Sequence, residues 1–426
     1  MKKIELKDIA ETLYYEKLNN GLEIYMVPKK NVNNVYVTYT TKYGSIHNQF
    51  VPLNEAKEVK VPNGIAHFLE HKMFEQRDGI DPMIYYASVG ADVNAFTSYK
   101  NTSYLFCGST HLKENLEYLL NYVGTPHFTD ENVEKEKGII EQEIRMYDDV
   151  YEWVLIDTIH YNAFHKHPLK YSVAGTVDDI MSITKEQLSL CYNTFYHPSN
   201  MFLVVTGNFE PLEIIETVKK EFASKEQSEA LIKLVSVEEP NSIVKAMEII
   251  QLDIKEPKLG IGVKIPIENI DMDIHKLNIY VMLLFDLLFG PTSVFYEKMH
   301  ENDLLTSPMF ITEEFTNQHI VVSLLCETKN NEQLLNEIKD NLNNPKINYQ
   351  DFERKKKILT GPEIRMYEDI QNLNRYIINQ IISYGKFDHN MIKSLLKSLN
   401  KKEFIDLIKK LDLSQMVTVL IEPIKK

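Results

Sequence analysis

Two histidines and a glutamate with helical spacing are the residues of this sequence that could bind a metal ion. Residues 63–74 read NGIAHFLEHKMF, in which His67, Glu70 and His71 form the pattern H-x-x-E-H. Residues three and four apart share one face of a helix, so both imidazoles could bind one ion while the carboxylate reaches the ion's water. This donor set suits Zn²⁺ in a catalytic site, and the pattern is the inverted zincin signature. Chance alone gives such a pattern in roughly 3% of chains of this length, so its context must decide.

A catalytic zinc site needs a third protein ligand, and Glu143 is the candidate. It lies in the helical stretch 130–148, with Glu136 two turns earlier on nearly the same face. We expect Glu143 to be the third ligand and Glu136 to be an outer group that orients a ligand or tunes the site. The alternative is that Glu136, Glu141 and Glu143 form a solvated acidic face.

The remaining histidines show weaker patterns. His160, His165 and His167 lie close together in HYNAFHKHP, but they lack a ligand period, and we expect surface or capping roles. His197 precedes Pro198 at the start of an expected strand, and packing is the simpler interpretation.

The chain contains one unit twice. The motif Glu-Ile-Arg-Met-Tyr-acid-Asp begins at Glu143 and again at Glu363, an offset of 363 − 143 = 220 residues. The segments that contain Cys107 and Cys326 also match, at an offset of 326 − 107 = 219 residues. Because neighbouring segments keep nearly one register, the repeat indicates a duplicated structural unit.

The duplication predicts two homologous domains. We expect an N-terminal domain over 1–221, a polar linker over 222–242 and a C-terminal domain over 243–426. Alternating and helical periodicities are mixed within each domain, which indicates an α+β fold with one mainly antiparallel sheet and packed helices. In the first copy the expected strands are 21–27, 35–41, 91–98, 102–108 and 201–207, and the expected helices are 63–74, 111–123, 130–148, 154–164 and 184–195.

The second copy provides an internal comparison for the metal motif. It keeps Glu363, but the region that corresponds to 67–71 reads roughly FDLLFGPTSVFYEK and contains no histidine. The two copies therefore read as one metal-bearing domain and one metal-free domain.

Composition excludes several classes of protein. Hydrophobic residues are 44% of the 426 residues, which is typical of a globular chain, and the formal net charge of −14 argues against nucleic-acid binding. Cys107, Cys191 and Cys326 form no C-x-x-C pair, so a reducing compartment is expected. The most apolar segment, 279–289, contains Asp286 and is shorter than a membrane span. With no signal peptide recognised at the N-terminus, we expect a cytoplasmic protein that does not enter membranes.

Four segments resemble the M16 (pitrilysin/insulinase) family of zinc metallopeptidases. They are GIAHFLEHKMF, the stretch with Glu136 and Glu143, VNAFTSYKNTSYLF and YHPSNMFLVVTGNFE, and the chain length resembles the bacterial processing-peptidase branch. The resemblance implies that His67, His71 and Glu143 bind zinc and that Glu70 is the general base. Glu136 matches the family's secondary acidic residue, and we count it with the catalytic residues.

The resemblance also implies where substrate binds. Asn94 and Ala95 would lie on a strand that pairs with the substrate backbone beside the zinc, and Phe96 would flank it. A plain half-buried strand is the alternative reading of VNAFTSY. Many family members hold substrate with an Arg and a Tyr of the second domain, but the pair Arg375-Tyr376 cannot be assigned to that role.

These features together predict a zinc-dependent endopeptidase. It would cleave short or unfolded peptides with metal-activated water, in a chamber that two chains enclose, and peptide maturation is a narrower expectation. We expect a homodimer or a heterodimer with a second M16-like chain. The alternative is a non-catalytic M16-like subunit that acts in assembly or peptide binding.

Overall fold

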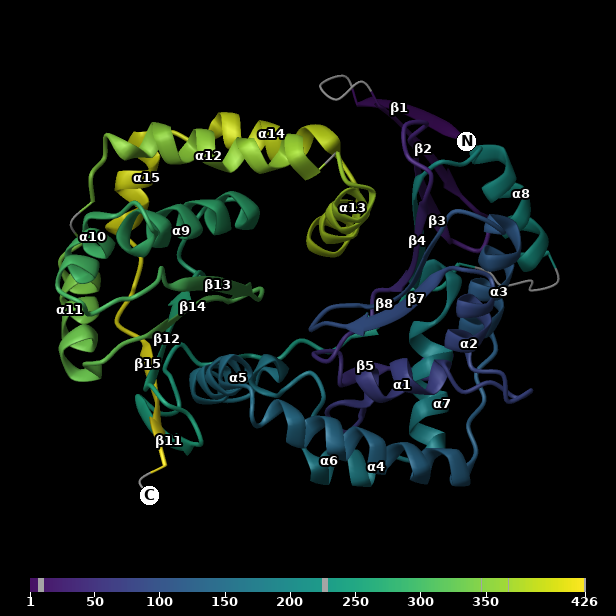
Figure 1. The fold of residues 1–426 in the computed structure, drawn as a ribbon, viewed down its shortest axis with the longest axis horizontal. Helices are drawn as coiled ribbons and strands as arrows, with labels where there is room; N and C mark the ends of the chain where they lie inside the picture. The colour runs from purple at the N-terminus through teal and green to yellow at the C-terminus, as the bar shows by residue number, and fades with distance from the viewer. Residues whose placement is uncertain (7–10, 224–228, 346, 367, 425–426) are drawn as a thin grey trace. The chain divides into compact units, whose positions relative to one another are not determined.

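The computed structural model describes residues 1–6, 11–223, 229–345, 347–366 and 368–424, without the side chains of 360–366. The described chain forms two compact units, each with its own sheet and hydrophobic core (Figure 1). Unit 1 comprises 1–144, 172–236 and 363–389, and unit 2 comprises 145–171, 237–362 and 390–426. The expected α+β class is confirmed.

Unit 1 is built on a seven-stranded sheet with the order β1-β2-β3-β9-β4-β8-β7. All neighbouring strands are antiparallel except β3 and β9. The central strand β9 reads MFLVVTG and is buried along its whole length, as expected for a strand covered on both faces. The strands are β1 (Lys2–Leu6), β2 (Glu11–Lys17), β3 (Glu23–Pro28), β4 (Val35–Thr41), β7 (Asp92–Thr97), β8 (Thr102–Gly108) and β9 (Met201–Gly207), and a small second sheet contains β5 (Gln49–Val51), β6 (Val59–Lys60) and β10 (Lys233–Leu234).

Helices of unit 1 bury their apolar sides in one core with this sheet. They are α1 (Ile65–Met73), α2 (Pro82–Ser88), α3 (Leu112–Gly124), α4 (Asp130–Tyr147), α6 (Val177–Ser182), α7 (Lys185–Phe195) and α8 (Pro211–Phe222). A further helix of unit 1, α13 (Ile370–Tyr384), lies outside this core and packs on β4 and β9. The helix α4 starts in unit 1 and runs past the boundary at residue 144.

Unit 2 repeats the core of this topology with a five-stranded sheet of order β11-β15-β12-β14-β13. The parallel pair β11/β15 corresponds to β3/β9, and the antiparallel series β12, β14, β13 corresponds to β4, β8, β7. This correspondence agrees with the duplication inferred from the sequence. The strands are β11 (Met247–Leu252), β12 (Lys258–Pro266), β13 (Phe310–Phe315), β14 (His319–Glu327) and β15 (Met416–Pro423).

The helices of unit 2 include its most apolar segment. Residues 274–301 are long and apolar enough to cross a membrane by length and composition alone. However, 61% of the 18-residue apolar stretch within this segment is buried inside the protein. Leu277 and Leu284 of this segment belong to the hydrophobic core of unit 2, so we interpret it as core helix. The helices are α5 (Tyr151–Ala163), α9 (Ile274–Phe289), α10 (Val294–Glu301), α11 (Asn331–Asn343), α12 (Asp351–Met366), α14 (His389–Ser398) and α15 (Lys401–Ile408).

The compact units differ from the continuous domains expected at 1–221 and 243–426. The helix α5 of the N-terminal half packs on β12 and β15 of unit 2, and α13 of the C-terminal half packs on β4 and β9 of unit 1 (Figure 1). Asn374 of α13 donates hydrogen bonds to the backbone oxygens of Tyr36 and Val204 within unit 1. The two halves therefore exchange a helix, and each of these helices packs on the sheet that belongs mainly to the other half.

Two glycines of β12 allow α5 to approach the sheet of unit 2 closely. A Cβ atom at Gly262 would lie 2.2 Å from Cγ2 of Ile159, and one at Gly260 would lie 3.0 Å from Cδ2 of Leu155. Real Cβ atoms do not tolerate the first distance, so residue 262 must be glycine for α5 to pack where it does.

The expected linker over 222–242 is attached at both of its ends. Residues 233–234 form β10, which pairs with β5 in unit 1. In unit 2, the buried Glu239 binds the Lys264 ammonium at 2.8 Å and accepts from the backbone amides of His165, Lys166 and His167.

Candidate metal centre

The helix α1 presents the H-x-x-E-H motif on one face and its apolar residues on the other. Its buried side includes Ile65, Phe68 and Leu69, which belong to the core of unit 1. The helix starts after Gly64, whose φ of 77° is left-handed and whose Cβ would lie 2.2 Å from the Ala174 oxygen. Only glycine fits this left-handed conformation at such a close contact. Gly64 therefore sets where α1 starts and in which direction the motif face points.

The helix α4 brings the acidic residues to the same place. Thr129 accepts from the backbone N–H of Asn132 at 3.1 Å, and the Asn132 side chain accepts from the Thr129 N–H, so the helix begins where the sequence predicts. The fully buried Lys72 of α1 donates to the Asn132 carbonyl oxygen at 3.1 Å and to the Glu75 carboxylate. This ammonium ties α1 directly to the first turn of α4.

Three predicted ligands converge between α1 and α4. The Glu143 Oε2 atom lies 3.2 Å from Nε2 of His71 and 3.7 Å from Nε2 of His67. One ligand atom from each residue lies within 4.8 Å of the other two. Two ligands that are each about 2.1 Å from a tetrahedral zinc ion are about 3.4 Å apart, so these spacings fit a single ion.

Glu136 lies behind His71. Its Oε1 atom is 3.0 Å from Nδ1 of His71, and the side chain is buried. A carboxylate at Nδ1 fixes the tautomer that leaves Nε2 facing Glu143, which is the usual outer arrangement around a metal-binding histidine. Burial by itself would lower the pKa of His71, but the hydrogen bonds that its ring donates to the Glu136 and Glu143 carboxylates raise it to about 9.

His67 fits the role of a neutral metal ligand. Burial and the neighbouring His71 lower the pKa of His67 to about 4, so the imidazole keeps a free nitrogen lone pair at neutral pH. Its Nδ1 atom is buried and has no hydrogen-bond partner among the described residues. The donor set, the spacing and this neutral imidazole agree with a site that Zn²⁺ can occupy.

Glu70 stands beside the three ligands on the motif face of α1. Its Oε2 atom accepts a hydrogen bond of 2.6 Å from the Thr97 hydroxyl. Burial raises the pKa of Glu70, whereas this hydrogen bond acts in the opposite direction. Thr97 was not among the residues selected from the sequence, although it lies within the VNAFTSY segment.

The strand β7 carries the three residues expected to contact substrate. It lies at one edge of the seven-stranded sheet and packs against α1. Its burial alternates, with Asn94 and Phe96 exposed and Ala95 partly buried. The Asn94 side chain accepts from the backbone N–H of Ala95 at 2.8 Å, so in this structure a side chain covers that amide.

Other residues singled out in the sequence lie elsewhere. The side chain of Glu363 is outside the described residues. Arg375 is exposed on α13, and the neighbouring Tyr376 is buried with its ring against Phe387. Neither observation assigns this pair to substrate.

The expectation of a surface or capping role was wrong for His160. It is 3% exposed in α5, where burial lowers its pKa to about 4, because α5 packs against the sheet of unit 2. His167 does cap a short turn, since its side chain accepts from the Leu169 N–H. His197 makes the same contact with the Ser199 N–H.

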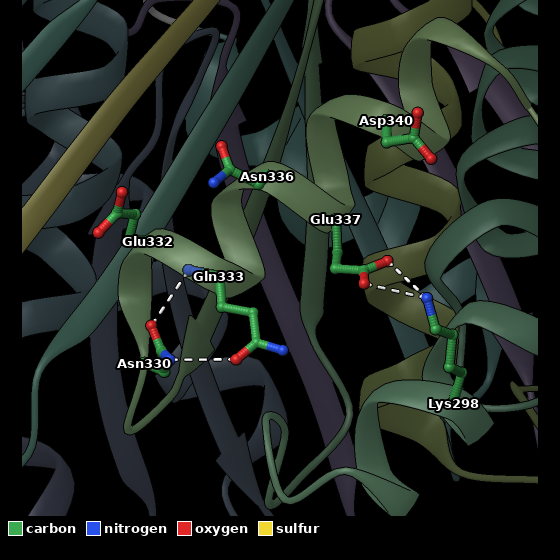
Figure 2. A pocket seen from close by; sticks show the side chains of 7 residues that line it. All are labelled: Lys298, Asn330, Glu332, Gln333, Asn336, Glu337 and Asp340. Atoms are coloured by element: carbon green, nitrogen blue, oxygen red, sulfur yellow. Dashed lines mark hydrogen bonds and ion pairs between the residues drawn. The ribbon is translucent and has the colours of Figure 1, made fainter.

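A surface hollow of about 540 Å³ lies in unit 2, between α10 and α11. Figure 2 shows its polar lining, in which Lys298 contacts both oxygens of Glu337 at 3.0 and 2.8 Å and Asn330 caps α11. None of the predicted site residues lines it, and its one lysine is paired with Glu337. We therefore assign the chemistry to the group in unit 1.

Comparison with known proteins gives consistent matches. Residues 54–177 match the family described as Insulinase (Peptidase family M16), and residues 182–359 match the Peptidase M16 inactive domain. The protein named Uncharacterized zinc protease YmfH from Bacillus subtilis is 43% identical over 303 residues, 71% of this chain and 71% of that protein. The mitochondrial-processing peptidase subunit beta of Caenorhabditis elegans is 26% identical over 190 residues, 44% of this chain and 42% of that subunit.

A solved structure extends the similarity to the whole chain. The crystal structure of an M16-like peptidase from Alicyclobacillus acidocaldarius has a TM-score of 0.90 and 29% identity, covering 99% of this chain and 100% of that one. The expected family resemblance is thus confirmed over both units. This chain belongs to peptidase family M16.

Proposed function

We propose that this protein is a zinc-dependent endopeptidase that cleaves short or unfolded peptides. The observation that carries the proposal is the convergence of His67, His71 and Glu143, with ligand atoms within 4.8 Å, next to the Glu70 carboxylate. The zinc proteases among its relatives support the same class of activity.

Each polar residue of the group has a separate task in this proposal. His67, His71 and Glu143 would hold the ion. When bound, the ion would polarise the carbonyl of the substrate and lower the pKa of its bound water to near 7. Glu70 accepts the proton of the attacking water and then delivers it to the leaving amine. Glu136 holds the His71 ring through Nδ1 and so orients a ligand without contacting substrate.

Substrate would bind along β7. An extended peptide can add to the edge of a sheet through backbone hydrogen bonds, which accept many sequences in one register. We assign Asn94, Ala95 and Phe96 to this contact. The Asn94 side chain would leave the Ala95 amide when a peptide backbone takes its place. Length and extendability of the peptide would then matter more than its sequence, as in peptide processing or maturation.

We propose that the active form is a homodimer or a heterodimer with a second M16-like chain. The relative from Caenorhabditis elegans is described as one subunit of a processing peptidase, which supports a paired arrangement. A cytoplasmic location stays a prediction from the sequence.

We would test the proposal with a quenched-fluorescence peptide assay. The assay would use the purified chain alone and together with any co-purifying partner. We expect cleavage that a chelator abolishes and added Zn²⁺ restores. Glu70→Gln should keep the metal and lose about 100- to 10,000-fold in rate, because the general base is gone. A protein that binds zinc but cleaves no peptide in any of these samples would instead be the non-catalytic subunit.

A further inference from the structure

We propose that Thr97 is a positioning residue that fixes the Glu70 carboxylate to the strand proposed to bind substrate. This inference rests on the proposed function, because it concerns the geometry of the general base. It assigns a role to a hydroxyl outside the H-x-x-E-H motif and outside the expected substrate residues.

The hydrogen bond between Thr97 and Glu70 joins two separate elements. Glu70 lies on α1, Thr97 is the last residue of β7, and their oxygens are 2.6 Å apart. A hydroxyl that donates to a carboxylate makes a short and strong hydrogen bond. It holds the Oε2 atom of Glu70 and leaves Oε1 as the oxygen available to a water.

A second threonine lies beside the first and does not compete for its proton. Thr97 pairs with Thr102 across β7 and β8, and the two hydroxyl oxygens are 3.2 Å apart. Thr102 is fully buried and donates to the Tyr43 carbonyl oxygen at 2.9 Å. Thr102 therefore keeps its own partner while Thr97 donates its only proton to Glu70.

The side-chain alternation of β7 explains why a hydroxyl is needed at this position. Val93, Ala95 and Thr97 share one face of the strand, and Val93 and Ala95 pack against the hydrophobic core. The third residue of this face meets Glu70 and not an apolar side chain. The strand β7 thus carries both the backbone proposed to bind the peptide and the Thr97 hydroxyl that holds Glu70. The position of the base is therefore fixed relative to the bound peptide.

Hydroxyl-deletion variants test the role in catalysis. Thr97→Val keeps the shape and the strand preference but removes the donor, and we expect kcat to fall about 10- to 100-fold, as for loss of a hydrogen bond to a charged group. KM and zinc content should stay within about twofold of the wild type, and Thr97→Ser should restore most of kcat. The matched control is Thr217→Val on α8, which removes another buried hydroxyl whose partner is the Glu213 carbonyl oxygen.

A measurement on metal-free protein tests the contact without activity. In a double-mutant cycle of thermal unfolding in chelator, Thr97→Val and Glu70→Ala should be non-additive, because either change removes the same hydrogen bond. Thr217→Val and Glu70→Ala should be additive. Additive shifts for Thr97 and Glu70, or a kcat for Thr97→Val equal to that of Thr217→Val, would overturn the inference.

The failure of this inference can be told from the failure of the proposed function. If Glu70→Gln cleaves peptides at the wild-type rate, Glu70 is not the base and the proposed function fails. If Glu70→Gln is inactive while Thr97→Val has normal kcat and no coupling to Glu70, only the role of Thr97 is wrong.

Discussion

His67 and His71 lie one turn apart on α1, yet their surroundings give them opposite protonation behaviour. Burial and the neighbouring His71 lower the pKa of His67 to about 4. Two carboxylates, Glu136 and Glu143, overcome burial and raise the pKa of His71 to about 9. The first imidazole is ready to bind a cation, and the second is oriented by the acidic residues around it. The residue types and spacing predicted that both histidines are metal ligands, but only the fold supplies the environments that separate their pKa values.

Replacing Glu136 should weaken metal binding without removing a ligand. Glu136→Gln removes the carboxylate at Nδ1 of His71, and loss of such an outer partner usually lowers metal affinity about 10- to 100-fold. Competition with a chromogenic chelator measures the affinity. Glu134→Gln is the control, because Glu134 is exposed on the same helix and pairs with Lys137. Equal zinc affinity in the two variants would show that Glu136 does not orient His71.

His67, Glu70 and His71 could be predicted from the sequence because their spacing on one helix is local information, and Glu143 could be predicted because it begins a repeated motif in a second helix. Thr97 and Lys72 could not, since each acts through a contact with another element: Thr97 reaches Glu70 from β7, and Lys72 reaches the Asn132 carbonyl oxygen on α4. Long-range contacts of this kind leave no periodic pattern.

At the scale of elements, strong periodicity predicted the central strands and the long helices. The strand over 35–41 and the strand over 102–108 match β4 and β8 in full. Other elements of unit 1 were missed in the sequence, among them β1, β2, α2 and α8. The sequence also contains no indication that α5 packs on the sheet of unit 2 and α13 on that of unit 1, because no local pattern states which sheet a helix will cover.

The contact between α5 and β12 gives a prediction for Gly262. A methyl group there would meet Ile159 at 2.2 Å, so Gly262→Ala should destabilise unit 2 by about 1–3 kcal/mol through overpacking. Trp153, the single tryptophan, lies on α5 and reports this unit in urea unfolding followed by fluorescence. Gly138→Ala in unit 1 is the control, since no atom lies within 4 Å of its added Cβ and its backbone is not left-handed. An unchanged fluorescence midpoint for Gly262→Ala would contradict the close packing of α5.

At the scale of the molecule, the two duplicated units share a sheet topology but differ in the polar groups that they carry. Both keep the same order of five strands, but in the part of the chain that the structure describes, unit 2 has no group like His67, His71 and Glu143. Unit 2 instead buries an ion pair of Lys264 and Glu239, which anchors the connection between the halves to the turn after α5. Among its described residues, the second copy thus keeps the strand order of the first without the ligand group.

The buried Glu239 predicts acid sensitivity of unit 2. Burial alone would raise the pKa of this carboxyl, but hydrogen bonds from Lys264 and three backbone amides lower it to about 2. The folded pKa is below the ordinary value near 4.5, so the carboxylate stabilises the fold above that pH. This contribution, on the order of 3 kcal/mol, is lost as pH falls from about 4.5 to 2.

Urea unfolding followed by Trp153 fluorescence, repeated between pH 7 and 2, checks this dependence. The wild type should lose stability more steeply below pH 4.5 than Glu239→Gln, which has no carboxyl to protonate at this position. Parallel stability curves for the two proteins would show that Glu239 does not titrate as the structure requires.

Anomalous diffraction at the zinc edge, from crystals of the zinc-loaded protein, tests most directly whether the predicted ligands hold a zinc ion. We expect one strong peak per chain, bounded by His67, His71 and Glu143, at about 2.0–2.2 Å from each ligand atom. The claim that these three residues share one ion would be contradicted if protein that cleaves peptides gave crystals with no peak there. A zinc peak located elsewhere on the chain would contradict it equally.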